Sequence, residues 1–367
     1  DHRDLHKEYR RQRQMCIRDR GIIGAGKVVQ ERHIPRLKAI PGVEMGLVWK
    51  RSLEEGEVLA NEHGFARAVA DWREIIDSPD IDALIIGTPP VLHRDATLAG
   101  LDAGKHVLCQ ARMARNLKEA QEMASAALKS DKITCLYPPA PGLKGDNTMK
   151  RLINDEPFIG TVREVRMVAM TPPSANDNYH WRYDPDVSGV HMLSMGMWIE
   201  VLHRWVGKTT SLSAQARTYT SKVGAPSGGW LKSIVPESLV ISAQLEVGGQ
   251  LSYHLSTEAA FAGHNTIEIY GSKGALRYSL SDDTILGATS GMGGFETITP
   301  DPDEIRAHTT DAEFIAAIRG GPEVSPSFQE GLNYMEFCES VAQAVHFGQV
   351  VPTPPEPLMA TWGKLLE

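Results

Sequence analysis

The sequence predicts an α/β chain of two domains, an N-terminal domain with a parallel sheet and a C-terminal α+β domain with an open, mostly antiparallel sheet. The length of 367 residues suits two domains at about 150 residues each. Up to residue 137, short apolar runs alternate with helical segments, which is typical of βαβ units and a parallel sheet. Beyond residue 138, strand patterns follow one another without intervening helices, which indicates antiparallel pairing.

Composition and charge exclude several classes of protein. The formal net charge is −8 and no basic patch accompanies it, so neither nucleic acid nor an anionic membrane is expected as a partner. No apolar run is long enough to cross a bilayer. The four cysteines show no metal-binding spacing, which predicts reduced thiols in a cytoplasmic protein and no metal site.

The first domain is expected to span residues 21–137. Its predicted strands are 44–49, 83–87, 106–109 and 133–137, and its predicted helices are 27–39, 53–63, 72–77, 95–103 and 117–130. Residues 1–20 are expected to be a disordered or artefactual tail, because residues 15–20 lack the apolar run of a buried first strand and resemble translated adapter sequence. The first strand is therefore expected to be short.

The second domain is expected to span residues 138–351, followed by a Pro-rich tail at 352–367. Residues 162–170 alternate in polarity, as a half-buried strand does. Further strands are predicted at 211–219, 239–247, 250–257, 266–270 and 275–280, the last two flanking a hairpin turn. Helices are predicted at 148–154, 190–206, 311–319 and 328–347.

A glycine-containing loop lies between the first strand and the first helix, in the run Gly24-Ala25-Gly26-Lys27-Val28-Val29. A pyrophosphate needs a tight turn and a close backbone approach at a helix N-terminus, where free N–H groups and the dipole favour anions. Val29 stands where G-x-G-x-x-G has its third glycine, so the match to this motif is incomplete. The βαβ units that follow are the main support for a dinucleotide-binding loop. We therefore predict a Rossmann dinucleotide-binding domain, with Gly24, Gly26, Lys27 and Val28 at the cofactor.

The second strand ends in Lys50-Arg51-Ser52, where an acid usually holds the adenosine ribose diol. Loss of that carboxylate removes repulsion for a 2′-phosphate, while two cations and a hydroxyl attract one. These three residues are predicted to bind NADP, with NAD possible. The alternative is that Lys50 and Arg51 are solvated residues that open a loop.

Several motifs together resemble the glucose–fructose oxidoreductase/inositol dehydrogenase family (Gfo/Idh/MocA). They are Thr88-Pro89-Pro90 with His93, the run 103–109, Trp181-Arg182, Ser188-Gly189, Gly196, and the runs 204–207 and 270–274. The resemblance implies a nicotinamide cofactor held between the two domains, with Thr88, Pro89 and His93 beside the nicotinamide and Trp181 and Arg182 reaching the cofactor. It also implies a homodimer or homotetramer.

The chain departs from this family at its acid–base residues. The family's E-K-P is Gln110-Ala111-Arg112 here, and its D-x-G-x-H is Ser194-Met195-Gly196-Met197-Trp198. The usual Lys, Asp and His are therefore absent, and a Trp cannot take a hydroxyl proton. Gln110 is expected at the cofactor, and Ser194 and Trp198 at the substrate.

Other residues are candidates to replace the missing groups. His191 shares a helical stripe with residues 194, 195 and 198 and titrates near neutrality, so it is predicted to be the acid–base group. Arg112 is predicted to polarise a carbonyl or hold a carboxylate, because it is always cationic. Tyr137 and His180 are further catalytic candidates and His264 a substrate contact. The alternative for Arg112 is a contact with cofactor phosphate only, and the alternative for His191 and the other candidates is a purely structural role.

The expected function is a nicotinamide-dependent oxidoreductase that acts on a sugar, polyol or other cyclic hydroxy/keto compound. One alternative keeps the cofactor but gives elimination or glycoside cleavage with no net redox change. Another is a catalytically degenerate dinucleotide-binding protein. The absent acid–base residues favour this last alternative, whereas the retained Thr-Pro-Pro, His93 and Trp-Arg features oppose it.

Overall fold

The computed structural model describes residues 19–137, 143–156, 158–173, 180–189, 193–220, 222–224, 228–232, 234–263, 265–305 and 309–356. The chain divides into two compact units. The first comprises Asp1–Ala114, Lys118–Pro138 and Thr309–Leu332, and the second comprises Arg115–Leu117, Pro139–His308 and Asn333–Glu367. A segment near the C-terminus thus joins the first unit, which the domain limits expected from the sequence did not include.

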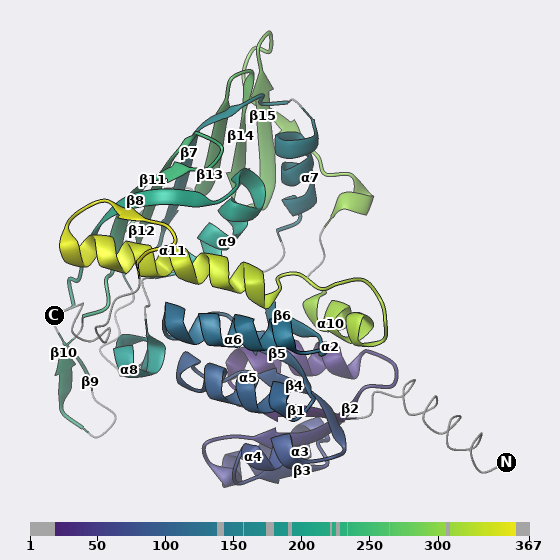
Figure 1. The fold of residues 1–367 in the computed structure, drawn as a ribbon. Helices are drawn as coiled ribbons and strands as arrows, with labels where there is room; N and C mark the ends of the chain where they lie inside the picture. The colour runs from purple at the N-terminus through teal and green to yellow at the C-terminus, as the bar shows by residue number, and fades with distance from the viewer. Residues whose placement is uncertain are drawn as a thin grey trace. The chain divides into compact units, whose positions relative to one another are not determined.

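The first unit contains a six-stranded parallel sheet in the order β3-β2-β1-β4-β5-β6 (Figure 1). Its strands are β1 (Asp19–Ile23), β2 (Glu44–Trp49), β3 (Arg67–Val69), β4 (Ile81–Ile86), β5 (His106–Gln110) and β6 (Thr134–Tyr137). Strand order reverses between β1 and β4, which pair in parallel. In an open sheet of this kind, ligands bind at the carboxyl ends of the strands beside that reversal.

Helices connect these strands, as the alternating pattern predicted. They are η1 (Val29–His33), α2 (Ile34–Lys38), α3 (Leu53–His63), α4 (Arg73–Asp77), η2 (Pro90–Leu92), α5 (His93–Asp102) and α6 (Leu117–Lys129), with α10 (Thr310–Ile318) from the later segment. The helix expected at 27–39 is thus a π-helical turn followed by an α-helical one.

The first strand begins earlier than the expected domain limit. β1 starts at Asp19, so two residues assigned to the tail lie in the sheet. Arg20 is fully buried within it, and Ile22 and Ile23 are also inaccessible. Register shifts on both sides of Arg20 interrupt its pairing with β2 and β4. Residues 1–18 lie outside the described residues.

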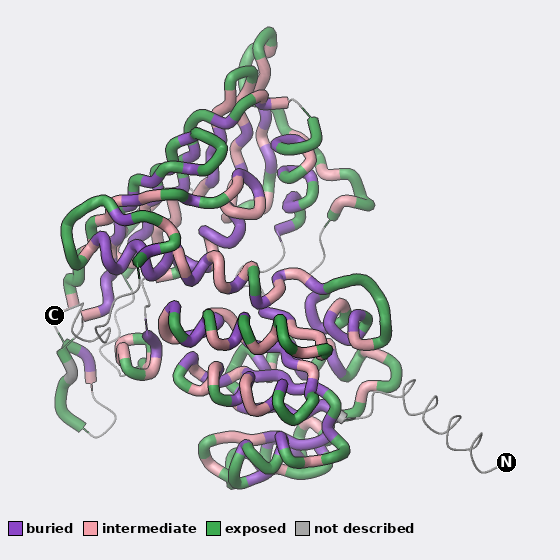
Figure 2. Tube along the Cα trace, in the orientation of Figure 1, coloured by how far each residue is buried: buried purple, intermediate pink, exposed green. Residues whose placement is uncertain are grey.

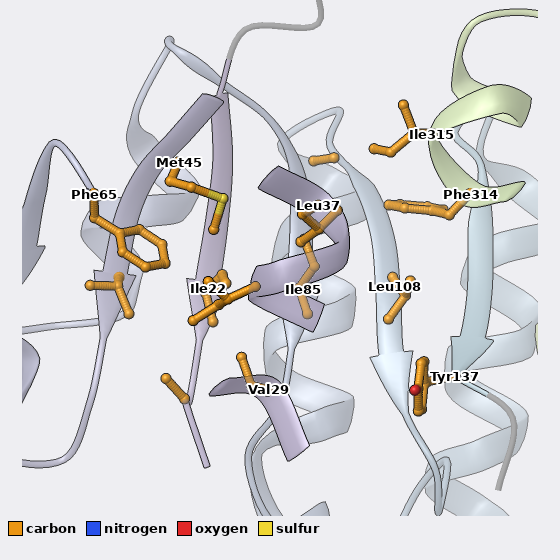
Figure 3. Packing of buried hydrophobic residues seen from close by; sticks show 14 of the residues in the cluster. Ile22, Val29, Leu37, Met45, Phe65, Ile85, Leu108, Tyr137, Phe314 and Ile315 are labelled. Atoms are coloured by element: carbon orange, nitrogen blue, oxygen red, sulfur yellow. The ribbon is translucent and has the colours of Figure 1, made fainter. Parts of the chain in front are cut away.

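The core of the first unit includes one face of the parallel sheet and the helices packed on it. Figure 3 shows Ile22, Ile85 and Leu108 on neighbouring strands, with Leu37 of α2 and Phe314 of α10 on the same side. All five side chains are fully buried. Phe314 therefore explains why the segment from Thr309 to Leu332 belongs to this unit, since its side chain is part of the same buried cluster. The buried run of β4 is also visible in Figure 2.

The second unit contains a nine-stranded sheet in the order β16-β15-β14-β13-β7-β12-β11-β8-β17. Its strands are β7 (Val162–Met170), β8 (Thr209–Arg217), β11 (Ser238–Leu245), β12 (Gln250–Ser256), β13 (Thr266–Gly271), β14 (Gly274–Ser279), β15 (Thr284–Thr289), β16 (Glu296–Ile298) and β17 (Val351–Pro352). Within the described strands, only the β7–β12 pair of this sheet is parallel. The expected fold class, a parallel domain followed by a mostly antiparallel one, is confirmed.

The helices of the second unit are α7 (Asp146–Lys150), η3 (Arg151–Asp155), η4 (Trp181–Tyr183), α8 (Pro185–Ser188), α9 (Met195–Val206), η5 (Pro302–Glu304) and most of α11 (Phe328–Phe347). A two-stranded ribbon pairs β9 (Lys222–Gly224) with β10 (Trp230–Lys232). The helix expected over 190–206 begins at Met195 within the described residues. None of the helices in the described ranges is long and apolar enough to span a membrane.

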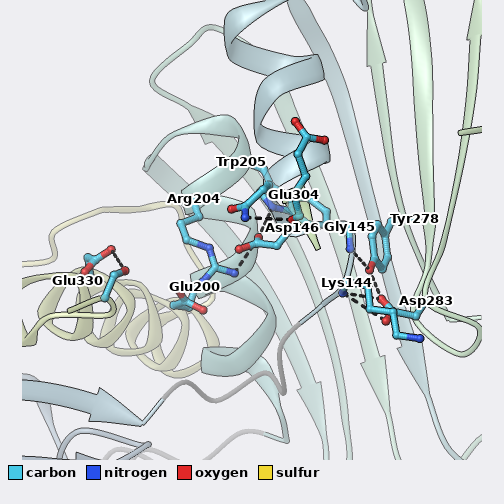
Figure 4. A network of polar contacts seen from close by, with 12 residues as sticks. Lys144, Gly145, Asp146, Glu200, Arg204, Trp205, Tyr278, Asp283, Glu304 and Glu330 are labelled. Atoms are coloured by element: carbon cyan, nitrogen blue, oxygen red, sulfur yellow. Dashed lines mark hydrogen bonds and ion pairs between the residues drawn. The ribbon is translucent and has the colours of Figure 1, made fainter. Parts of the chain in front are cut away.

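A buried polar network joins α7 to α9 in the second unit. Arg204 contacts Asp146 at 3.1 Å and Glu200 at 2.8 Å, and the indole of Trp205 donates to Asp146 at 2.7 Å. Figure 4 shows the guanidinium pointing toward these carboxylates. The Arg204-Trp205 motif that carries part of the family resemblance therefore has an architectural role here.

Candidate functional site

The glycine loop at the carboxyl end of β1 is packed directly against the end of β4. Gly24 has φ of +85°, and a Cβ added there would lie 2.4 Å from Cγ2 of Thr88 and 2.8 Å from its backbone nitrogen. The Gly24 N–H also donates to the carbonyl of Trp49, the last residue of β2. The loop is thus fixed between β2 and β4, and glycine is required at this position for both dihedral and steric reasons.

Gly87 provides the space that a small third residue of the G-x-G-x-x-G motif would provide, because that third residue is Val29 here. In the usual motif a small third residue allows the helix to approach the strand closely. Here a Cβ on Gly87 would lie 2.2 Å from Cγ2 of Val29 and 2.5 Å from the carbonyl oxygen of Gly24. The space that the motif normally gains on the helix is therefore supplied by the strand end. This role of Gly87 was not predicted from the sequence, although a glycine directly before Thr88-Pro89 was the available signal.

Gly26 lies beside open space. Among the described residues, the only atom within 4 Å of a Cβ added at Gly26 would be the carbonyl oxygen of Gly87, at 3.9 Å. Lys27 and Val28 follow at the start of the helix, both exposed. The first N–H groups of a helix have no intrahelical acceptor, so they face this space as anion donors. These features fit a dinucleotide pyrophosphate at this loop.

Two buried polar atoms that have no hydrogen-bond partner among the described residues lie at the ends of β4 and β5. They are Oγ1 of Thr88 and Nε2 of Gln110. Thr88 is 9% exposed, and β4 and β5 are neighbouring strands. A buried donor without an acceptor costs about 1–3 kcal/mol, so such atoms suit the polar groups of a ligand. Thr88 and Gln110 were both predicted from the sequence to lie at the cofactor.

His93 is buried, and its ring nitrogens contact backbone carbonyl groups at both of these strand ends. Its Nε2 lies 2.7 Å from the carbonyl oxygen of Thr88, and its Nδ1 lies 2.8 Å from that of Arg112 and 3.2 Å from that of Met113. The ring is 1% exposed; burial lowers the pKa of His93, while the contacts with these carbonyl groups oppose that shift. We infer that His93 positions Thr88 and Arg112, because both ring nitrogens are engaged.

At the end of β2, the three residues predicted to bind a 2′-phosphate make different contacts. The Lys50 ammonium lies 2.8 Å from the carboxylate of Glu55, and hydrogen bonding to Lys50 lowers the pKa of Glu55. Ser52 is the N-cap of α3 and accepts from the Glu55 N–H at 3.3 Å. Arg51 is exposed. Glu55 was missed in the sequence, although Ser52-x-x-Glu55 matches the capping-box pattern.

Tyr137 lies at the end of β6 and faces the helices that cover the sheet. Its hydroxyl accepts from Arg36 of α2 at 2.9 Å, and its ring lies 4.2 Å from that of His33, centroid to centroid. Burial raises the pKa of Tyr137. The residue belongs to the apolar core cluster in Figure 3, which gives it a packing role beside its predicted catalytic one.

The second unit carries its own predicted site residues. The Arg182 guanidinium stacks over Trp181 at 4.4 Å, and the Arg182 backbone N–H donates to Nδ1 of His180 at 3.2 Å. Burial and the Arg182 cation lower the pKa of His180, which favours its neutral form. Ser194 is exposed at the start of α9, and Trp198 lies one turn later, half-buried. His191 and His264 lie outside the described residues.

The Ser188-Gly189 motif has a steric explanation. Gly189 has φ of +68°, and a Cβ there would lie 2.0 Å from the carbonyl oxygen of Arg115. The Arg115 side chain also donates to the carbonyl of Asp186 at 3.1 Å. This motif therefore fixes the segment after α8 against Arg115.

Comparison with known proteins agrees with this geometry. The model of an oxidoreductase family with an NAD-binding Rossmann fold matches residues 19–137, and the GFO/IDH/MocA C-terminal domain matches residues 147–277. A 1,5-anhydro-D-fructose reductase from Ensifer adhaerens is 26% identical over 335 residues, which are 90% of this chain and 96% of that protein. A levoglucosan dehydrogenase from Pseudarthrobacter phenanthrenivorans is 25% identical over 336 residues, 78% of this chain and 83% of that protein.

A solved structure shares the fold over nearly the whole chain. Levoglucosan dehydrogenase in complex with NADH superimposes with a TM-score of 0.82 at 22% identity, and the match covers 92% of this chain and 99% of that one. The two family models, not this structural match, confirm the family resemblance inferred from the motifs.

Proposed function

Because the chain belongs to the Gfo/Idh/MocA family of NAD-binding oxidoreductases, we propose that it transfers hydride between a nicotinamide dinucleotide and a carbon atom of a sugar or polyol. Other cyclic hydroxy or keto compounds belong to the same substrate class. The relatives support this class, since their names describe an anhydrofructose reductase and a levoglucosan dehydrogenase.

The observation that carries the proposal is the carboxyl edge of the parallel sheet. Gly26 leaves open space at a helix start, and the buried atoms Thr88 Oγ1 and Gln110 Nε2 lie on the neighbouring strand ends. In this proposal the space at Gly26 holds the pyrophosphate, and Thr88 Oγ1 and Gln110 Nε2 form hydrogen bonds with polar groups of the nicotinamide half. NADP(H) is the preferred cofactor in this proposal, because Lys50 and Arg51 replace the usual carboxylate; NAD(H) is also accepted.

The bound dinucleotide supplies or accepts the hydride. The residues of the chain do the rest: the loop at Gly26 holds the pyrophosphate, Arg112 orients an oxygen of the substrate, and His191 exchanges a proton with the substrate hydroxyl directly or through water. In the oxidation direction the carbinol carbon loses hydride and its hydroxyl loses a proton, so the product is a carbonyl compound. Ser194 and Trp198 are proposed to contact the substrate.

Turnover with a panel of sugars and polyols tests this function through the change in nicotinamide absorbance. His191→Asn should lower kcat by about 10²–10⁴-fold and leave the dinucleotide Kd within about twofold. His346→Asn, on the exposed end of α11, is the matched control and should keep wild-type turnover. Wild-type kcat in His191→Asn would overturn the assignment of this histidine.

A second function is favoured by one observation, the replacement of the family's Lys, Asp and His by Ala111, Ser194 and Trp198. These replacements favour a degenerate dinucleotide-binding protein, because oxidation of a hydroxyl needs a group that accepts its proton. Elimination or glycoside cleavage with no net redox change keeps the dinucleotide and is the other alternative. Product formation without a net absorbance change would identify this alternative. Dinucleotide binding without turnover of any substrate would indicate a degenerate binding protein.

A homodimer or homotetramer is also proposed. One face of the nine-stranded sheet is open to solvent along β11, where exposed and buried residues alternate and Val240 is 46% exposed. Light scattering coupled to size exclusion would measure the oligomeric state, and a monomeric mass would contradict this expectation.

A further inference from the structure

The first turn of α3 reaches back to the end of β2. Ser52 caps the helix, and three residues later the Glu55 carboxylate lies 2.8 Å from the Lys50 ammonium. In a capping box the third-position glutamate usually bonds the backbone of the capping residue. Here its carboxylate instead pairs with a lysine two residues before the cap. The Lys50 side chain is 22% exposed and that of Glu55 65% exposed, so the pair lies at the rim of the sheet.

A glycine in the same helix allows this close approach. Gly56 is buried, and a Cβ there would lie 3.3 Å from Cβ of Ala68 and 3.8 Å from the backbone nitrogen of Lys50. The helix therefore lies directly on the strand end, with Glu55 beside Lys50. The strand end is itself bound to the glycine loop, because the Trp49 carbonyl accepts from the Gly24 N–H at 3.0 Å. Lys50 thus follows a residue that contacts the proposed dinucleotide loop.

The formal charges at this corner cancel. Lys50 and Arg51 contribute two positive charges, and Glu54 and Glu55 contribute two negative ones. A 2′-phosphate would meet cations from the strand end and carboxylates from the helix. The carboxylate of Glu55 also competes with the phosphate for the Lys50 ammonium, whereas an unphosphorylated ribose needs no cation. Ser52 accepts the Glu55 N–H and keeps its own hydroxyl proton to donate.

We propose that Glu55 determines the choice between NADP(H) and NAD(H) by holding the Lys50 ammonium away from the 2′-phosphate. This inference rests on the proposed function, because it needs a nicotinamide dinucleotide in the site. Glu55 acts through Lys50 and is a positioning residue. Glu55 thereby reduces the difference in affinity between NADP(H) and NAD(H) that Lys50 and Arg51 would give alone, so the wild-type chain binds both dinucleotides.

The test is the ratio of dissociation constants for NADPH and NADH, measured by titration of the full chain at low salt. Glu55→Gln should tighten NADPH binding about two- to fivefold, the upper part of the range that corresponds to releasing one exposed ion pair. Its Kd for NADH should stay within about twofold of wild type, since no charge on NADH lies at this corner. Raising the salt concentration should shrink the gain, because the pair is exposed and screened.

Two further variants isolate the mechanism. Glu54→Gln removes the same charge one residue earlier on the same helical turn, where the described residues show no ion pair with Lys50, and it should change the ratio much less than Glu55→Gln. Lys50→Met should weaken NADPH binding and abolish the effect of Glu55→Gln in the double variant. Melting temperatures of Glu54→Gln and Glu55→Gln should stay close to wild type, because both glutamates are exposed.

The outcomes separate this inference from the proposed function. Binding of both dinucleotides with an unchanged ratio in Glu55→Gln, or an equal change in Glu54→Gln, would overturn the role of Glu55 and leave the function intact. Persistence of the Glu55→Gln effect in the Lys50→Met background would overturn it as well. Binding of neither dinucleotide to the wild-type chain would overturn the proposed function and this inference with it.

Discussion

The imidazole of His33 and the carboxylate of Asp311 lie 2.5 Å apart, both side chains fully buried, although 278 positions separate them in the sequence. Arg36 lies 3.8 Å from the same carboxylate and donates to Tyr137 at the end of β6. The pair joins α10 to η1, the helix that follows the glycine loop. The late segment is therefore attached to the first unit by a buried polar contact as well as by Phe314.

Asp311→Ala should destabilise the first unit by about 1–3 kcal/mol, because it leaves a buried ring nitrogen of His33 without its hydrogen-bond partner. Chemical denaturation measures the free energy of unfolding. Glu323→Gln removes a carboxylate from an exposed position of the same segment and should cost less than about 0.5 kcal/mol. A loss below about 1 kcal/mol in Asp311→Ala would show that the contact contributes little.

Gly87→Ala should lower the stability of the fold, whereas Gly26→Ala should leave stability unchanged and weaken dinucleotide binding. At Gly87 the new Cβ would lie 2.2 Å from Val29 and 2.5 Å from the Gly24 carbonyl, so we expect a loss of about 1–3 kcal/mol in the free energy of unfolding. Val29→Ala should restore part of this loss, since it removes one of the two clashes. At Gly26 the nearest atom of the described residues would be 3.9 Å from the new Cβ, so the melting temperature should stay at the wild-type value.

The Gly26→Ala variant should nevertheless bind dinucleotide at least about tenfold more weakly, because its methyl group enters the space proposed for the pyrophosphate. Titration with NADPH and NADH measures this effect. Wild-type affinity in a folded Gly26→Ala protein would place the pyrophosphate elsewhere.

Stability should fall as the pH is lowered from about 6.5 to about 4, in part because of His106. Burial, with the Lys132 cation adding to it, lowers the pKa of His106 to about 4, and its Nδ1 accepts from the Ile133 N–H at 2.9 Å. An unfolded histidine has a pKa of about 6.5, so between these values the unfolded chain binds the extra proton. The neutral ring therefore stabilises the fold above about pH 6.5, and this contribution is lost as the pH approaches 4.

His106→Asn keeps an acceptor for the Ile133 N–H and removes the titration. Its free energy of unfolding should depend less steeply on pH in this window, by up to about 1.4 kcal/mol per pH unit. The comparison is with wild type and with His346→Asn, which removes an exposed histidine. Parallel pH profiles for His106→Asn and wild type would contradict this interpretation.

The sequence predicted those parts of the fold that a local pattern determines. Strict alternation placed β7 at Val162–Met170, with the bounds that the structure has. Strand β15 was missed because Gly287 interrupts its pattern; in the structure a Cβ there would lie 2.5 Å from Ile298, so the glycine permits the close approach of β16. The contact between His33 and Asp311 has no local signal, since neither residue belongs to a motif.

In the candidate site, too, local motifs predicted the positions of residues, whereas contacts between elements could not be predicted. Motifs located Gly24, Thr88 and Gln110 at the sheet edge, because each lies at or just after the carboxyl end of a strand. The pattern Ser52-x-x-Glu55 could have indicated the helix cap, but no local pattern shows that Lys50 is already paired with Glu55, since that contact depends on how α3 packs on β2. The residues that replace the family's acid–base groups stay a prediction, with His191 as the first candidate.

Arg204→Met should destabilise the second unit by about 3–5 kcal/mol, because Asp146 and Glu200 are 1% and 4% exposed and would lose the cation between them. Methionine keeps much of the side-chain volume, so the loss reports on charge more than on packing. Arg217→Met, at an exposed position of β8, is the matched control and should stay within about 0.5 kcal/mol of wild type. Adding Asp146→Asn to Arg204→Met should recover part of the stability, since a neutral amide keeps an acceptor for the Trp205 indole without a buried charge. Chemical denaturation, monitored by tryptophan fluorescence, of the wild type, both single variants and the double variant gives the coupling free energy between the two sites. Strictly additive losses would show that the arginine and the carboxylate act independently.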